Sequence, residues 1–339
     1  MCTFNQDWAQ VEPTAGWILV KNLKPVEASA AIAPTLTTAK VCGRGDRETA
    51  IEVSMTAPCA WQIEQDPFRH ELLVTFPGAR SQMFEINHDA HPAGVLGVQR
   101  GWKDGMPYLR VDTSSHWGYR TTWDGKKFCL LWKSPPSLKF EGLKICLDAG
   151  HGGSDSGTKG HLGSFEKDHN LRVTLAVGRL LSQRGVEVIW TRESDKDVAS
   201  ASVAADVELA ARVEIARQNQ ADLFLSIHHN AMADIAKGKL AHGTDAYYFQ
   251  PHSADLARFI VEPLAKALGE ESHSYRWRSL GVIRQTEMPA VLVECNYLSN
   301  PELEKGILSE PDYPERAAEA IVEGIGNFLL SRSLGSVDK

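Results

Sequence analysis

Two histidines and one glutamate occur where their side chains could meet around a metal ion. His151 follows the apolar run LKICLDAG, and His228 follows a second run, LFLSI, so both imidazoles are expected at the ends of strands. Glu166 stands 15 residues after His151, at the start of the next predicted helix, and could return to the same edge. Sheets of α/β proteins bind their ligands at this carboxyl edge.

This set of donors is typical of catalytic zinc, because two histidines and one carboxylate leave a fourth position for water or substrate. Nitrogen and oxygen donors without a thiolate favour zinc, and Co²⁺, Mn²⁺ or Fe²⁺ would fit less well. Each residue also has an ordinary interpretation. A histidine at a strand end is more often a satisfied polar residue, and the helix dipole favours a glutamate in a first turn. Spacing alone leaves both interpretations open.

Glu294 is the candidate for the proton transfers that amide hydrolysis requires. A bound zinc ion lowers the pKa of its water to ~7 and polarises the carbonyl, but a proton must still reach the leaving amine. Glu294 ends the predicted strand AVLVE and could act as general base and then as general acid. A structural salt bridge is the alternative role. Cys295 is expected to be a small core residue, since no spacing assigns a histidine base to it.

The elements that must position these residues follow a βαβ pattern from Leu143 onward, with short apolar runs between helical stretches. The expected fold class is α/β, with a roughly six-stranded twisted sheet covered by helices on both faces. The short apolar runs LKICLDAG, VEVIWT and LFLSI predict strands. The stretches NLRVTLAVGRLLSQRG and DVELAARVEIARQNQ predict helices. Further strands are expected near residues 245–249, 280–284 and 290–294, and further helices through Phe259 and over residues 314–330.

The first part of the chain has a different periodicity. Between about residues 15 and 134 apolar residues alternate, as in Ile51, Val53 and Met55, which predicts a smaller antiparallel β-sandwich domain. Two Asp-Gly pairs, at 104–105 and 124–125, predict hairpins. The segment KSPPSLKFEG breaks this pattern. The expected organisation is a β-rich domain at 1–134, a linker at 135–142, a catalytic domain at 143–332 and a tail at 333–339.

Composition excludes several classes of function. The net charge of −7 carries no basic block, which argues against binding to nucleic acid. No apolar run approaches the ~18 residues that a transmembrane helix needs. The six cysteines contain no CxxC pair, which argues against a cysteine zinc site or a thioredoxin-type motif. The first residues lack the features of a secretory signal, and Cys2 is expected to be an ordinary surface residue.

The segment from Leu143 to about Leu330 resembles the zinc-dependent N-acetylmuramoyl-L-alanine amidases of the amidase-3 type. The strings DAGHGGSDSG, EKDHNL, TRESD, LAARVEIARQNQADLFLSIHHN and MPAVLVECNYLSNPELE occur in the order and spacing of that family. The resemblance implies that zinc-activated water hydrolyses the amide bond between N-acetylmuramic acid and L-alanine in peptidoglycan. It also implies that His151, Glu166 and His228 bind the zinc and that Glu294 is the catalytic glutamate.

Two departures from the family pattern lie close to these residues. His229 stands where the family usually has a small residue, and Asn296 with Tyr297 where it usually has Gly-Phe, which affects the pocket wall behind Glu294. Four other histidines have no partner spacing and are expected at the surface: His161, His169, His242 and His252.

The resemblance also implies a place of action and partners. It predicts a periplasmic or extracytoplasmic enzyme that acts on peptidoglycan, with an envelope or divisome protein as a candidate activator. The β-rich domain is similar in pattern and position to AMIN-type targeting domains. Two alternatives stay open: a zinc peptidase that cuts within the stem peptide, and a non-catalytic protein that binds peptidoglycan.

Overall fold

The computed structural model describes residues 3–5, 8–11, 16–19 and 33–334, except for 67–68, 82–83, 89–92, 116, 137, 202, 233–236, 238, 271–272 and 286. The chain divides into two compact units, Met1–Ser134 and Pro135–Lys339. Cys2 and residues 335–339 of the predicted tail lie outside the described residues. Among the described helices, none is both long and apolar enough to cross a lipid bilayer.

The first unit is built from β-strands, as expected. Its strands are β1 (Thr3–Asn5), β2 (Trp8–Val11), β3 (Gly16–Leu19), β4 (Thr35–Arg44), β5 (Glu48–Met55), β6 (Gln62–Asp66), β7 (Glu71–Thr75), β8 (Arg80–Ser81), β9 (Ile86–His88), β10 (Val95–Lys103), β11 (Met106–Thr113), β12 (Tyr119–Trp123) and β13 (Lys127–Lys133). One antiparallel sheet has the order β10-β11-β7-β6. A second has the order β12-β13-β5-β4-β8, with β9 also beside β4, and a small third sheet joins β1, β2 and β3.

Aromatic side chains join the two larger sheets of this unit. Phe76, directly after β7, contacts Phe128 of β13 edge to face, with 5.4 Å between the ring centroids. Both rings are fully buried, so apolar area on the two inner faces is removed from water together. The Asp-Gly hairpin at Asp104 and Gly105 is confirmed, since these two residues have φ of 52° and 76° and connect the partners Lys103 and Met106.

The second unit is an α/β fold, which confirms the expected class. Its strands are β14 (Lys144–Ala149), β15 (Glu187–Trp190), β16 (Leu223–Asn230), β17 (Thr244–Tyr248), β18 (His273–Trp277) and β19 (Ala290–Tyr297). Its helices are α1 (Glu166–Ser182), α2 (Ala205–Gln218), α4 (Ala254–Leu268), α5 (Pro301–Lys305) and α6 (Tyr313–Leu334), with 3-10 turns η2 (Pro251–Ser253), η3 (Gly281–Ile283) and η4 (Ile307–Ser309).

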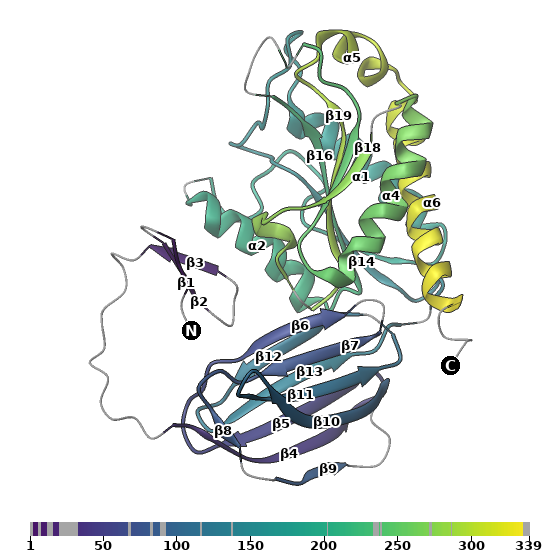
Figure 1. The fold of residues 1–339 in the computed structure, drawn as a ribbon. Coiled ribbons are helices and arrows are strands. Elements are labelled where there is room, and N and C mark those ends of the chain that lie inside the picture. The colour runs from purple at the N-terminus through teal and green to yellow at the C-terminus, as the bar shows by residue number, and fades with distance from the viewer. Residues whose placement is uncertain are drawn as a thin grey trace. The chain divides into compact units, whose positions relative to one another are not determined.

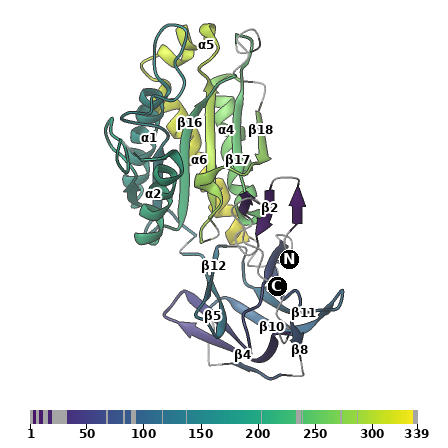
Figure 2. The same ribbon diagram turned by 90° about the vertical axis from the view of Figure 1, so that its left-hand side faces the viewer.

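These strands form one mixed sheet with the order β15-β14-β16-β19-β17-β18. Strands β15, β14, β16 and β19 are parallel, whereas β17 runs antiparallel to β19 and parallel to β18. Helices α4 and α6 lie on one face of the sheet and α2 lies on the other, while β18 forms an edge (Figures 1 and 2). The central strands are buried on both faces, which accounts for their continuous apolar runs.

Three details of the sequence-based expectation are wrong. The segment predicted as a strand near 280–284 is instead the 3-10 turn η3, in which the Ile283 N–H donates to the Leu280 carbonyl oxygen at 3.2 Å. Val282 and Ile283 are both buried, and such a short apolar run does not by itself distinguish a strand from a helical turn. The sixth strand is β18. Its large apolar residues, Tyr275 and Trp277, are exposed, so its sequence lacks the buried apolar residues that predict a strand. His169 and His252 are also buried rather than at the surface, because they lie on the inner side of helical segments.

Helices α4 and α6 pack closely at Gly324. A Cβ atom at this position would lie 2.6 Å from the Ile260 Cα and 2.6 Å from the Phe259 carbonyl oxygen, both of which are backbone atoms that cannot turn aside. We expect Gly324→Ala to lower the free energy of unfolding by about 1–3 kcal/mol, measured by urea denaturation, since overpacking outweighs the better helix propensity of alanine.

Gly326 provides a matched control in the same helix. Its added Cβ would lie 3.5 Å from the Phe140 ring, which is an ordinary contact. Gly326→Ala is therefore expected to leave stability unchanged or to raise it by up to about 1 kcal/mol. Equal losses in the two variants would contradict the close approach of the helices at Gly324.

His252 predicts a loss of stability in acid. Its Nε2–H donates to the Met288 carbonyl oxygen at 3.3 Å, and complete burial lowers the pKa of the ring from 6.5 to about 3. Below about pH 6.5 the unfolded chain binds a proton at this residue that the folded chain does not bind, so stability falls as the pH falls. At pH 5 this loss should reach about 2 kcal/mol.

The comparison is between the parent protein and His252→Gln, which cannot titrate, in urea denaturation at pH 8, 6.5 and 5. Below pH 6.5 the unfolding free energy of the parent should fall relative to that of His252→Gln. His161→Gln, at an exposed site, controls for the change of residue type. Parallel pH curves for the parent and His252→Gln would show that the buried ring does not cause the loss.

Candidate functional site

Three side chains that the sequence singled out come together at one edge of the sheet. His151 follows β14, Glu166 is the first residue of α1, and His228 lies in β16. One ligand atom from each residue lies within 4.8 Å of the other two. His151 Nε2 is 3.1 Å and His228 Nδ1 is 3.0 Å from the same oxygen, Glu166 Oε1. We call these three residues the donor cluster.

Local backbone geometry explains why these side chains can meet. Strands β14 and β16 are parallel neighbours, with Ala149 paired to Ile227, so the residues that follow lie at the same height. Gly150 lets the His228 ring lie against the backbone, because a Cβ there would be 2.2 Å from the ring Nε2. His151 itself has a φ of 59°, in the left-handed region, which turns the chain sharply after the strand.

Asp155 orients the first histidine. Its Oδ2 lies 2.7 Å from His151 Nδ1, so Nδ1 carries the hydrogen when the ring is neutral and Nε2 keeps a lone pair toward Glu166. Burial alone would lower the pKa of His151, but the bonds to Glu166 and Asp155 outweigh it and raise that pKa to about 9. Burial opposes ionisation of Glu166 as well, yet the two histidines hold its pKa well below the usual range.

These shifts mean that the donor cluster stabilises positive charge at its centre. Two ring nitrogens and one carboxylate oxygen converge, and His151 has the carboxylate partner that metal-binding histidines ordinarily have. The residues therefore fit a divalent cation with nitrogen and oxygen ligands, and zinc is the ion that this set favours.

Glu294 lies directly beside the donor cluster. In the parallel pair β16–β19 its Cα partner is His228. Its Oε2 is buried and has no hydrogen-bond partner within the part of the chain that the structure describes. Burial, with a smaller contribution from Glu166 and Asp245, raises the pKa of Glu294 to about 7, although His228 opposes the shift. The carboxyl group can therefore accept and release a proton near neutral pH.

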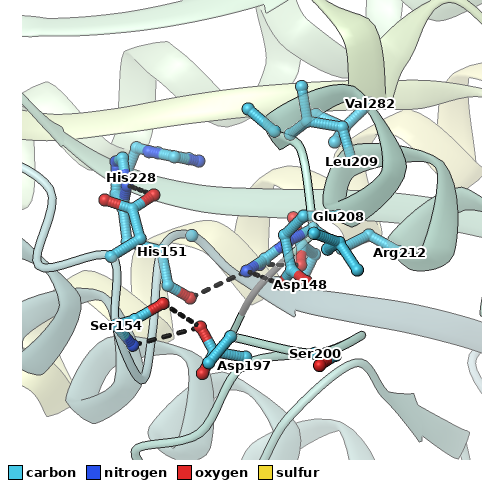
Figure 3. Close-up of a pocket in the computed structure, with 15 residues that line it drawn as sticks. Asp148, His151, Ser154, Asp197, Ser200, Glu208, Leu209, Arg212, His228 and Val282 are labelled. Carbon is cyan, nitrogen blue, oxygen red and sulfur yellow. Dashed lines mark hydrogen bonds and ion pairs between the residues drawn. The ribbon is translucent and has the colours of Figure 1, made fainter.

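A cavity of about 400 Å³ opens beside the donor cluster. Figure 3 shows His151 and His228 at one end of it, and Leu209 with Val282 at the other. Its wall combines apolar and acidic side chains, which include Val203, Leu209, Val282, Asp155, Asp197 and Glu208. The cavity gives a substrate access to the donor cluster from the side of α2.

A buried chain of hydrogen bonds supports Glu166 from behind. Asn170 Nδ2 lies 3.1 Å from the Gly150 carbonyl oxygen and 3.3 Å from Glu166 Oε1, so this atom is the amide nitrogen and donates. Asn170 Oδ1 must then accept from His229 Nδ1 at 2.8 Å. His229 Nε2 is left as an acceptor, and the Tyr313 hydroxyl donates to it at 2.6 Å.

Only one arrangement of hydrogens satisfies this chain, from Tyr313 through His229 and Asn170 to Glu166. Burial lowers the pKa of His229 well below its ordinary value and raises the pKa of Tyr313 well above its own, so both groups stay neutral. The chain thus fixes the orientation of the Asn170 amide and, through it, of the Glu166 carboxylate.

Sequence reasoning found the donor cluster and Glu294 but missed their supporting residues. Asp155 had a local signal, because it stands four residues after His151 in the loop DAGHGGSDSG. Tyr313 had none, because 84 residues separate it from His229. His229, which departs from the family pattern, has a structural role through its hydrogen bond with the Tyr313 hydroxyl.

Tyr313→Phe tests this buried chain. The substitution removes one hydroxyl without changing the ring, and leaves His229 Nε2 as a buried acceptor without a donor. The free energy of unfolding, from urea denaturation, should fall by about 1–3 kcal/mol. Tyr248→Phe, whose hydroxyl makes no hydrogen bond with the described residues, should change it by less than about 0.5 kcal/mol. Similar small effects of both substitutions would exclude a stabilising bond to His229.

Comparison with known proteins agrees with this site. Residues 145–327 match the family described as N-acetylmuramoyl-L-alanine amidase (Amidase_3). An uncharacterized protein of Bacillus subtilis, YqiI, is 34% identical over 192 residues, which cover 56% of this chain and 85% of that protein. The germination-specific N-acetylmuramoyl-L-alanine amidase of the same organism is 32% identical over 209 residues, which cover 59% of this chain and 85% of that protein.

Among solved structures, the catalytic domain of CwlV, an N-acetylmuramoyl-L-alanine amidase from Bacillus (Paenibacillus) polymyxa, is 34% identical and has a TM-score of 0.48. The match covers 56% of this chain and 99% of that domain. The family match spans more than half of the chain and includes the donor cluster and Glu294. The chain belongs to the N-acetylmuramoyl-L-alanine amidase family Amidase_3.

Proposed function

We propose that this protein hydrolyses the amide bond between N-acetylmuramic acid and L-alanine in peptidoglycan, with a zinc ion bound by His151, Glu166 and His228. The observation that carries the proposal is the convergence of three donor atoms within 4.8 Å, next to the half-buried Glu294, whose buried Oε2 has no hydrogen-bond partner among the described residues. Membership of the amidase family supports the choice of substrate.

The mechanism follows from the positions of the side chains. Zinc, when bound, would supply a water of lowered pKa and polarise the scissile carbonyl. Glu294, beside His228 and with its pKa raised by burial, takes the proton from the attacking water. The same carboxyl group then donates this proton to the nitrogen of L-alanine, so that the amine leaves in neutral form. Asp155 keeps the His151 ring in the orientation that the metal requires.

The substrate also implies where the protein acts. Peptidoglycan lies outside the cytoplasmic membrane, so we propose an extracytoplasmic enzyme. An activator from the envelope or divisome, and an AMIN-like targeting role for the first unit, stay predictions from the sequence resemblance.

The first experiment is hydrolysis of purified peptidoglycan by the full chain, with and without a chelator. We expect soluble peptides with new L-alanine amino groups, and loss of this release when the metal is removed. Glu294→Gln keeps the size of the side chain but not its ability to accept a proton, so the rate should fall by roughly 10²–10⁴-fold while the zinc content stays unchanged.

Glu323→Gln, at an exposed position on α6, is the matched control and should keep the parent rate. New amino groups on residues other than L-alanine would identify a stem-peptide peptidase instead. Binding to sacculi without any release of peptides would support the non-catalytic interpretation.

A further inference from the structure

One row of side chains extends from the donor cluster to the edge of the sheet. His228 pairs with Glu294, Glu294 pairs with Asp245, and Asp245 pairs with Ser274, each on the next strand. Neighbouring strands lie ~4.8 Å apart, so Ser274 is about 10 Å beyond Glu294. Residues opposite one another across a sheet project to the same face, so this row lies on the face of the sheet from which His228 and Glu294 project.

Asp245 is the buried hub of this row. Its side chain is only 7% exposed, and its two oxygens accept hydrogen bonds from four residues on three strands. Oδ1 accepts from the Ser274 hydroxyl and from Arg276 Nη2, the latter at 3.3 Å. Oδ2 accepts from Asn230 at 3.4 Å and from the Tyr297 hydroxyl at 3.2 Å. Tyr297 is one of the residues that depart from the family pattern, and its hydroxyl donates to Asp245.

Arg276 is held by this hub but keeps donors free. Its Nε–H donates to the Ser274 hydroxyl at 2.6 Å and its Nη2 to Asp245, while its side chain is 57% exposed. A guanidinium group has five N–H donors, so three have no acceptor among the described residues. Two fixed bonds orient a planar fork, which is the arrangement that suits bidentate binding of a carboxylate.

The acidic side chains of the cavity are already bonded within the protein. Asp155 binds His151, Asp197 accepts from Ser154, and Glu208 pairs with Arg212. Their negative charge is thus partly used to hold loops and helices in place. Arg276 is also paired, with Asp245, but three of its N–H donors have no acceptor among the described residues, and its orientation is fixed. These donors are available to a negatively charged group of the substrate.

We propose that Arg276 binds a free carboxylate of the stem peptide, on the second or third residue after the scissile bond. This inference rests on the proposed amidase function and adds the peptide group that the site recognises. Ser274, whose hydroxyl Arg276 contacts, lies about 10 Å from Glu294, and an extended peptide spans about 3.3–3.6 Å per residue, so this distance corresponds to two or three residues. Asp245 and Ser274 act as positioning residues that fix the guanidinium.

The test compares synthetic muramoyl peptides that differ in one group. Muramoyl dipeptides and tripeptides are prepared with the side carboxylate of the second residue, or the terminal carboxylate of the third, either free or as a carboxamide. The zinc-loaded full chain should cleave at least one free acid more efficiently than its amide. Arg276→Gln should lower kcat/KM for that acid by roughly 10- to 100-fold and for its amide by less than twofold.

Arg276→Lys keeps the positive charge but loses the planar guanidinium group. It should therefore retain only part of the preference for the free acid over its amide. Arg179→Gln removes an arginine of similar exposure from α1 and should behave as the parent on every substrate. Equal cleavage of acids and amides by the parent, or an equal loss on both in Arg276→Gln, would overturn the carboxylate site while leaving the amidase function intact. Failure of the parent to cleave any of the substrates would instead refute the proposed function.

Discussion

The structure depends on the burial of one negative charge, the carboxylate of Glu166. Removing an ionised carboxylate from water is costly unless charges and hydrogen bonds surround it. Here the two histidines approach Oε1, and the Thr158 backbone N–H donates to Oε2 at 2.9 Å. The position of Glu166 at the first turn of α1 adds the favourable end of the helix dipole. A cation bound at the donor cluster would complete this compensation.

The turn before His151 is also fixed by buried charges and hydrogen bonds. Asp148 is buried at the end of β14 and binds Arg212, Ser226 and Thr191; burial opposes its ionisation, but Arg212 and the two hydroxyls keep its pKa low. Arg192 donates to the carbonyl oxygens of residues 149 and 150. Two buried arginines therefore fix the backbone from which His151 projects. Such a preorganised frame holds the donors in place before substrate arrives.

The features that sequence predicted are those with a local signal. His151 and His228 end apolar runs, Glu166 begins a helix, and the Asp-Gly pairs mark their own hairpins, so each could be identified from neighbouring residues. The strand β18 was missed because its aromatic residues face solvent at a sheet edge. The contacts of Tyr313 and Arg276 were also missed, because they join segments far apart in the chain and leave no periodic pattern.

The left-handed backbone of His151 has a consequence for which substitutions this position tolerates. A non-glycine residue with a φ of 59° carries conformational strain of the order of 1 kcal/mol, which glycine would relieve. Glycine would also remove one of the two rings that compensate the buried charge of Glu166. The gain in backbone freedom and the loss of charge compensation therefore oppose each other in the free energy of unfolding. The side chain that strains the turn is also one that stabilises the carboxylate beside it.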